Sequence, residues 1–142
     1  MKHLSSLCLL FSALLGTACT TSNAASSALP TAPSGSLSTE AFSGTVDVGG
    51  SDSHTFSVSL SGGQLNVILT AAGPPTTIYM GLGVGTPAGS SCSLLSSSQV
   101  LAQAGTTAQL SGTANAGTYC VAVFDAGNQT AQIAYSVTVT HY

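Results

Sequence analysis

From Glu40 to the end of the chain, apolar and polar residues alternate with a period of two. In the segment "HTFSVSL", Phe56 and Val58 alternate with Thr55 and Ser57. The same pattern recurs in "QLNVILT" (64–70), "IYMGLGVG" (78–85), "GTYCVAV" (117–123) and "AYSVTVTHY" (134–142). A period of two is typical of β-strands that bury one face, so five strands are predicted from the pattern alone.

Turn-forming residues separate these segments, in "GGSDS", "SGG", "AAGPP", "GTPAGSS", "NAG" and "DAGN". Shorter and weaker strand candidates lie at 42–48, 92–95 and 108–113. No segment after the N-terminal leader has the periodicity of an amphipathic helix. Seven to eight antiparallel strands in about 100 residues predict an all-β sandwich or barrel.

The strand segments resemble the bacterial pre-peptidase C-terminal (PPC) domain. The matching positions, over about Thr39 to Thr140, are Phe42 and Gly44, Phe56 and Val58, Gly63, Leu65, Val67 and Leu69, Gly117, Thr118, Tyr119, Val121 and Val123, and Tyr135, Val137 and Val139. The resemblance implies a jelly-roll-like antiparallel β-sandwich. PPC domains usually follow a secreted peptidase, and none precedes this domain, which removes the usual role of an appendage. The two internal cysteines are not part of the general family pattern.

The N-terminus has the features of an export signal. Lys2 and His3 precede an apolar run of twelve residues, 4–15, which is too short to span a bilayer but suits a signal-peptide core. Ala18 and Cys19 then resemble a bacterial lipobox, although Gly16 stands where leucine is usual. This resemblance implies lipidation of Cys19 and an outer-membrane or cell-surface lipoprotein. The alternative is ordinary cleavage, for example after Ala24, and a periplasmic or secreted protein.

Between the leader and the strands lies a segment that cannot form a core. Sixteen of the twenty residues from 20 to 39 are Ser, Thr, Ala or Pro, a composition typical of flexible linkers. The predicted organisation is therefore a signal peptide at 1–18, a tether at 19–38 and a PPC-like domain at 39–142. A plain mature N-terminus would have the same composition as a tether.

Charge limits the possible partners. Only 4% of the residues are charged, and Lys2 is the sole Lys or Arg in 142 residues. Phosphate backbones and anionic lipid surfaces are bound by Lys and Arg, so the composition argues against nucleic acid and against a basic membrane-binding face. We therefore expect contact with a membrane only through an N-terminal lipid, and a partner that is an envelope protein or a glycan.

Four cysteines are present, and their positions predict one disulfide. Cys8 lies in the leader, and Cys19 is either lipidated or removed by cleavage. Cys92 and Cys120 then remain as a pair in an oxidising compartment, where a bridge is expected. Their Cα atoms should lie within about 7 Å. The alternatives are two free buried thiols, or zinc ligands, for which no histidine has suitable spacing.

Candidate catalytic residues are few. No G-x-S-x-G motif occurs, and we expect His54 and His141 to be exposed near strand ends. Asp47, Asp52 and Asp125 border turns, where aspartate commonly caps backbone groups. A sharper hypothesis is a calcium site containing Asp47 and Asp52, although no D-x-D-x-D loop is present.

One aromatic residue suggests ligand binding. Tyr79 points away from the predicted buried face, beside Gly81 and Gly83, which would leave a shallow floor for a sugar ring. The simpler alternative is that Tyr79 covers a strand thinned by glycine. We therefore expect a non-catalytic structural or protein-interaction module of the cell envelope without a cofactor. A weak carbohydrate-binding module is the alternative. A hydrolase is not expected, because the sequence shows none of the groups of catalytic residues that hydrolysis needs.

Overall fold

The computed structural model describes residues 35–142. They form eight β-strands: β1 (Ser38–Val46), β2 (Ser51–Val58), β3 (Gly63–Gly73), β4 (Tyr79–Ala88), β5 (Ser91–Gln103), β6 (Leu110–Ala114), β7 (Gly117–Asp125) and β8 (Ile133–His141). Among these residues, no helix is long and apolar enough to cross a membrane. The all-β prediction is confirmed, and the five strongly alternating segments correspond to β2, β3, β4, β7 and β8.

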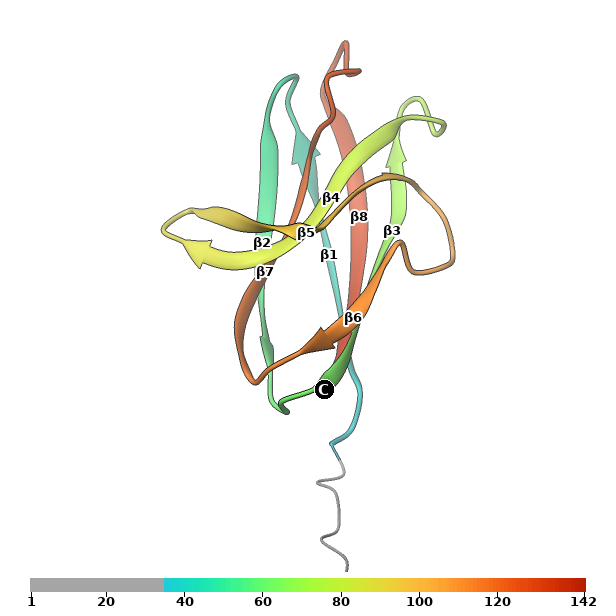
Figure 1. Cartoon of the computed structure of the whole chain (residues 1–142). Helices are drawn as coiled ribbons and strands as arrows, with labels where there is room; N and C mark the ends of the chain where they lie inside the picture. The colour runs from blue at the N-terminus through green and yellow to red at the C-terminus, as the bar shows by residue number, and fades with distance from the viewer. Residues whose placement is uncertain (1–34) are drawn as a thin grey trace, which may run out of the picture. The chain divides into compact units, whose positions relative to one another are not determined.

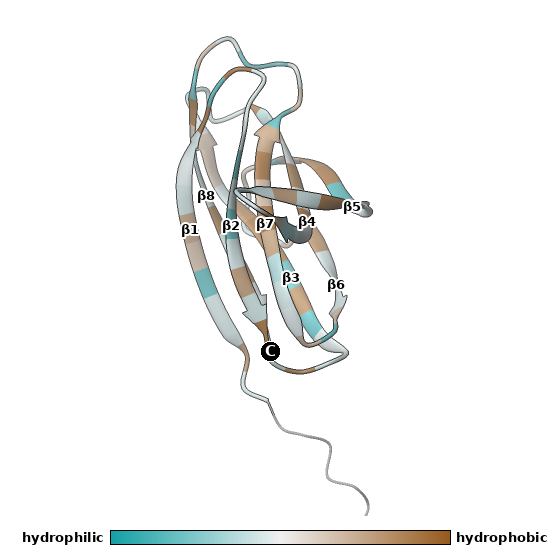
Figure 2. Cartoon of the chain, turned by 90° about the vertical axis from the view of Figure 1, so that its left-hand side faces the viewer, coloured by the Kyte–Doolittle hydropathy of each residue, from teal (hydrophilic) through white to brown (hydrophobic). Residues whose placement is uncertain are grey.

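The strands make two antiparallel sheets of four, in the orders β1-β8-β3-β6 and β2-β7-β4-β5 (Figure 1). Every connection except the β4–β5 hairpin crosses from one sheet to the other. This order is the jelly-roll arrangement of a double-sheet sandwich. Figure 2 shows β1 and β2 at one side of the sandwich and β5 and β6 at the other. The predicted jelly-roll-like β-sandwich is therefore observed.

The core lies between the sheets and contains the residues that alternation assigned to the buried face. On β8, Ile133, Tyr135, Val137 and Val139 are each at most 3% exposed, and the residues between them are not buried. Met80 and Leu82 of β4 are completely buried on the opposing sheet. Apolar side chains from both sheets thus meet in one layer, and their burial supplies the main driving force for folding.

The β4–β5 hairpin differs most from the sequence prediction. Strand β5 has thirteen residues, whereas only 92–95 were predicted, and the long "GTPAGSS" turn shrinks to Gly89 and Ser90. The register explains the length: Gly83 pairs with Gln99 and Gly85 pairs with Leu94. Residues 95–98 of β5 therefore lie opposite Val84 alone, which makes a large, irregular bulge. The polar run "SSSQ" (96–99) interrupts the apolar–polar alternation, so the pattern does not predict the full length of this strand.

Glycines of β4 allow other chain segments to approach it closely. A methyl group on Gly85 would overlap the backbone carbonyl of Ser93, and one on Gly81 would overlap the ring of Phe124. Both glycines are buried although they face the outer side of the β2-β7-β4-β5 sheet. The first half of β5 and the ring of Phe124 thus cover the outer face of β4.

Candidate functional site

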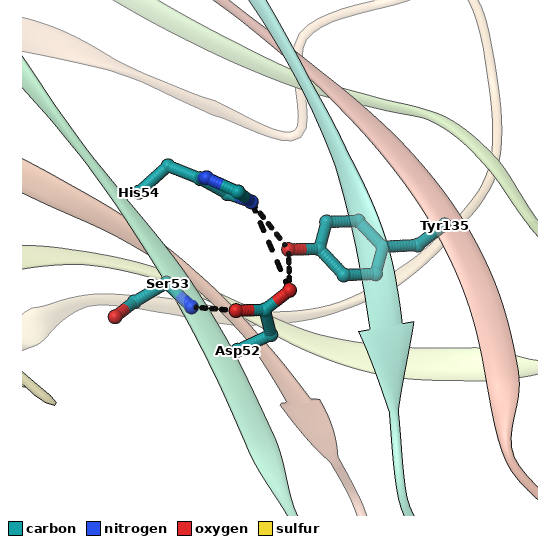
Figure 3. Close-up of polar contacts among 4 residues, drawn as sticks. All are labelled: Asp52, Ser53, His54 and Tyr135. Carbon is teal, nitrogen blue, oxygen red and sulfur yellow. Dashed lines mark hydrogen bonds and ion pairs between the residues drawn. The ribbon is translucent and has the colours of Figure 1, made fainter. Parts of the chain in front are cut away.

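Polar side chains join the two sheets where β1 and β2 meet (Figure 3). The hydroxyl of Tyr135 on β8 donates a hydrogen bond of 2.9 Å to Oδ2 of Asp52 on β2. Nε2 of His54 lies 3.0 Å from the same hydroxyl and 3.8 Å from Oδ2 of Asp52. Gly44 of β1 lies against this group, and a Cβ atom there would overlap the Asp52 carboxylate. The cluster of Asp52, His54 and Tyr135 is a fixed polar contact between the sheets.

The surroundings of Tyr135 in this cluster favour its protonated form. Burial, and then the hydrogen bond to Asp52, raise the pKa of Tyr135 above its ordinary value. The phenol therefore stays protonated at neutral pH and is not activated as a nucleophile. Phe42 stacks on the His54 ring at a centroid distance of 4.9 Å, which covers one face of the imidazole. The cluster therefore links β2 to β8 through side-chain hydrogen bonds.

The second histidine is also internal. His141 is 3% exposed, and its Nε2 lies 2.8 Å from Oε1 of Glu40 on β1. The ring of Phe56 lies 5.4 Å from the His141 ring. The expectation that both histidines are exposed is wrong: His141 is buried and His54 is about one-third exposed at its side chain. In sequence, both residues alternate in phase with the apolar face of their strands. This phase would have predicted that they point inward.

The remaining carboxylates stabilise loops. Asp125 accepts hydrogen bonds from the backbone N–H groups of Gly49, Gly127, Asn128 and Gln129, at 2.8 to 3.3 Å. The bond from Gly49 is the main cause that lowers the pKa of Asp125. This residue therefore links the β1–β2 turn to the β7–β8 loop. It has the capping role expected of a turn aspartate.

The two residues of the hypothetical calcium site have different partners. Oδ1 of Asp47 accepts a hydrogen bond of 2.7 Å from Gln132, whereas Asp52 binds Tyr135 and the N–H of Ser53. Within residues 35–142, no group of three or more His, Cys, Asp or Glu side chains is placed to hold a metal ion. The geometry offers no shared oxygen cage at Asp47 and Asp52.

Cys92 and Cys120 form the predicted disulfide, with Cα atoms 5.8 Å apart. Cys120 lies on β7 and pairs with Gly85 of β4, and Cys92 lies on β5 and pairs with Pro87. The bridge therefore passes over β4 on the outer face of its sheet and fastens the start of β5 to β7. This position indicates a stabilising role, because Cys120 is only 1% exposed.

Tyr79 is exposed at the surface, but the neighbouring glycines Gly81 and Gly83 are covered by other side chains. Its side chain is 52% exposed at the start of β4. The ring of Phe124 covers Gly81, and Leu94 and Gln99 lie over Gly83. The shallow glycine floor that the sequence suggested is therefore filled by other side chains. Leu101, 67% exposed and paired with Gly81, lies on the same outer face.

A hollow in the described domain lies between the edge strands β5 and β6. We call it the β5–β6 groove; it has a volume of about 320 Å³. Its lining consists of Leu65, Val67, Val84, Leu95, Ser97, Ser98, Leu110, Ser111, Gly112, Thr113, Ala114, Asn115 and Tyr119. No Asp, Glu, His, Lys or Arg contributes to it. The groove has an apolar floor and a rim of neutral polar groups.

This groove is not among the features predicted from the sequence. The large bulge of β5 contains Ser97 and Ser98, which line the groove together with Ser111, Gly112 and Thr113 of β6. A glycine at an inward position of a short strand, Gly112, was the available signal. Such a residue in a strand often marks a place where another chain or a ligand comes close.

The proposed lipidation site, Cys19, and the signal peptide lie outside the described residues. Comparison of the chain with models of known protein families and with curated proteins finds no match.

Proposed function

We propose that this chain is an exported, non-catalytic module of the cell envelope that binds a partner through the β5–β6 groove. One observation carries the proposal. The four acidic residues and two histidines of the described domain all make contacts within the fold, and none lines the groove. Hydrolysis and group transfer need a base or an activated nucleophile beside the substrate, and the groove offers only hydroxyl and amide groups. A neutral binding surface suits a partner without charge.

The export and anchoring part of the proposal rests on the leader, on Cys19 and on the Ser/Thr/Ala-rich segment after it. The PPC-like strand motifs support an exported sandwich module. Replacement of Cys19 by Ser should release the protein from membrane fractions. Intact mass spectrometry provides the direct test: a diacyl or triacyl mass on a chain beginning at Cys19 supports the anchor, and an unacylated chain beginning at Ala25 refutes it.

Site-specific photo-crosslinking tests whether the groove is the binding surface. A photoreactive amino acid at Ser97 would report on the rim of the groove. The matched control is the same group at Ser57, which is exposed on β2. In intact envelopes, adducts should form from Ser97 and not from Ser57. Adducts of equal yield at both positions, or none at Ser97, would contradict binding in the groove.

A weak carbohydrate-binding module is the second candidate, favoured by the exposure of Tyr79 and Leu101 on one outer face. Exposed aromatic rings can stack on sugar rings. On a glycan array, Tyr79→Ala should abolish all binding if this surface is the site. Binding that survives Tyr79→Ala would exclude this role for Tyr79.

A further inference from the structure

Both strands that border the β5–β6 groove have an unused edge. Within the described domain, β6 pairs only with β3, and β5 pairs only with β4. Unpaired N–H and C=O groups along an edge strand can pair with another extended chain. On the opposite side of the sandwich, the side chains of His54, Tyr135 and Asp52 join the sheets instead. The two sides of the sandwich therefore differ: the β5–β6 side combines free edges with a groove, and the β1–β2 side is joined by side chains.

Gly112 lines this groove and is itself exposed. It lies in the middle of β6, in phase with Ala114, which is 7% exposed, and with the half-buried Leu110. A Cβ atom built on Gly112 would meet no other atom within 4 Å, although this residue lines the groove. Its backbone is not in the left-handed region. An incoming side chain could therefore take the volume that a larger residue would fill.

The floor beneath this space belongs to the core. Val67 and Val84, at 0% and 4% exposed, line the groove from the two sheets. Tyr119 also lines it, but its ring is engaged with Phe56 at a centroid distance of 5.9 Å. An apolar side chain entering here would exchange water for contact with core residues. A charged side chain would lose its hydration without finding an opposite charge.

From these features we infer that the occupant of the groove is an extended, uncharged peptide strand that adds to the free edge of β6. The inference rests on the proposed function and specifies its partner. Strand β6 has five residues, so the added segment would pair over about this length. Its main chain binds the edge of β6, and an apolar side chain occupies the space beside Gly112. This is recognition by β-strand addition, in which the main chain supplies affinity and alternate side chains supply specificity.

The test uses a fluorescein-labelled peptide of nine residues in which Thr and Val alternate. Fluorescence anisotropy is measured with the mature chain in its oxidised form. Two modified peptides serve as probes of the mechanism: one has N-methyl groups on every amide and cannot donate a main-chain hydrogen bond along either edge, and the other has Lys in place of the central Val. Both should bind at least tenfold more weakly than the parent peptide.

Gly112→Val fills the groove from within and should weaken binding of the parent peptide at least tenfold. Valine favours strands, so the variant should unfold at the same or a higher denaturant concentration. Gly112→Ala provides a smaller change of the same kind. The matched control is Thr118→Val, which adds a β-branched apolar residue at an exposed position of β7 outside the groove. It should leave binding unchanged.

Equal binding of the N-methylated and parent peptides, or tight binding to Gly112→Val, would overturn strand addition. So would the absence of peptide binding at millimolar concentration. The crosslinks from Ser97 separate this failure from failure of the proposed function. If Ser97 captures a glycan in the envelope while no peptide binds, the groove is a binding site and the occupant inferred here is wrong. If neither experiment shows binding, both proposals fail.

Discussion

At the scale of single residues, the hydroxyl of Tyr135 joins the two sheets. It lies between Asp52 and His54 of the facing sheet and is the donor to the Asp52 carboxylate. Tyr135 itself is 3% exposed. Removal of this hydroxyl leaves Oδ2 of the partly buried Asp52 without its donor, while Oδ1 keeps the N–H of Ser53, and loss of a buried donor costs more than the bond contributes when it is formed.

Tyr135→Phe should therefore lower the free energy of unfolding by about 1–3 kcal/mol. Urea unfolding followed by tyrosine fluorescence or far-UV circular dichroism measures the change. The control is Tyr79→Phe, which removes a hydroxyl from a side chain that is 52% exposed and should change stability by less than about 0.5 kcal/mol. Equal effects of the two substitutions would show that the hydroxyl of Tyr135 has no special role.

The same phenol predicts a dependence of stability on alkaline pH. Burial and Asp52 raise the pKa of Tyr135 in the folded state, so the folded protein holds this proton more tightly than the unfolded chain does. The resulting stability is complete below the unfolded pKa, about 10, and is lost as pH rises toward the folded value. The midpoint of urea unfolding should fall above pH 10, and less steeply in Tyr135→Phe. Parallel curves for the two proteins would argue against this origin.

The histidines show what sequence alone could establish about residues. Alternation correctly assigns the buried faces of β2 and β8, and it places His54 and His141 on those faces. Their exposure was misjudged because a polar residue near a strand end is usually solvated. The hydrogen-bond partners of the two histidines, Glu40 and Tyr135, lie on strands distant in sequence, and no local pattern encodes this placement. The Cys92–Cys120 bridge was predictable because the leader predicts export to an oxidising compartment, and only these two of the four cysteines lie beyond the leader and Cys19.

At the scale of elements, the β4–β5 hairpin depends on Gly85. This residue pairs with Leu94 directly beside the large bulge of β5. Because it has no side chain, the backbone of Ser93 can come close. Backbone atoms cannot move aside as easily as the end of a flexible side chain. The bulge and the close approach explain why the length of β5 could not be derived from its sequence, in which serines interrupt the apolar alternation.

Gly85→Ala should destabilise the domain by about 1–3 kcal/mol, the usual cost of overpacking. Gly112→Ala is the matched control, because its added methyl group meets open space and should leave stability the same or slightly higher. Thermal or urea unfolding of the two variants gives the comparison. Similar losses in both would mean that a general glycine effect, and not contact with Ser93, is responsible.

At the scale of the whole molecule, one covalent bond restrains the unfolded chain. Cys92 and Cys120 are 28 residues apart in sequence. Loop-closure entropy predicts that the bridge stabilises the fold by about 3.5 kcal/mol, a large share of the roughly 5–15 kcal/mol of an ordinary domain. The double variant Cys92→Ser and Cys120→Ser should lose about this amount in urea unfolding under non-reducing conditions. Addition of a reductant should shift the unmodified protein in the same direction and leave the double variant unchanged.

The jelly-roll order was within reach of the sequence only by resemblance. Alternation shows which face of a strand is buried but not which strand lies beside it, and seven of the eight strands pair with partners distant in sequence. Resemblance to an exported sandwich family supplied the arrangement that periodicity could not. The groove depends on this arrangement, because β5 and β6 become edges only in this order of strands.

The disulfide has a further consequence for the groove, because every lining residue except Leu65, Val67 and Val84 falls between the two cysteines. The segment that forms the rim is thus a loop closed by the disulfide. A protease that cuts one exposed peptide bond within residues 95–98 would not separate the chain into two molecules. Such nicked protein should migrate as one species in a denaturing gel without reductant, and as two fragments only after reduction. The β6 edge therefore stays attached to the domain after a first cut in this segment, so a single proteolytic event need not remove it.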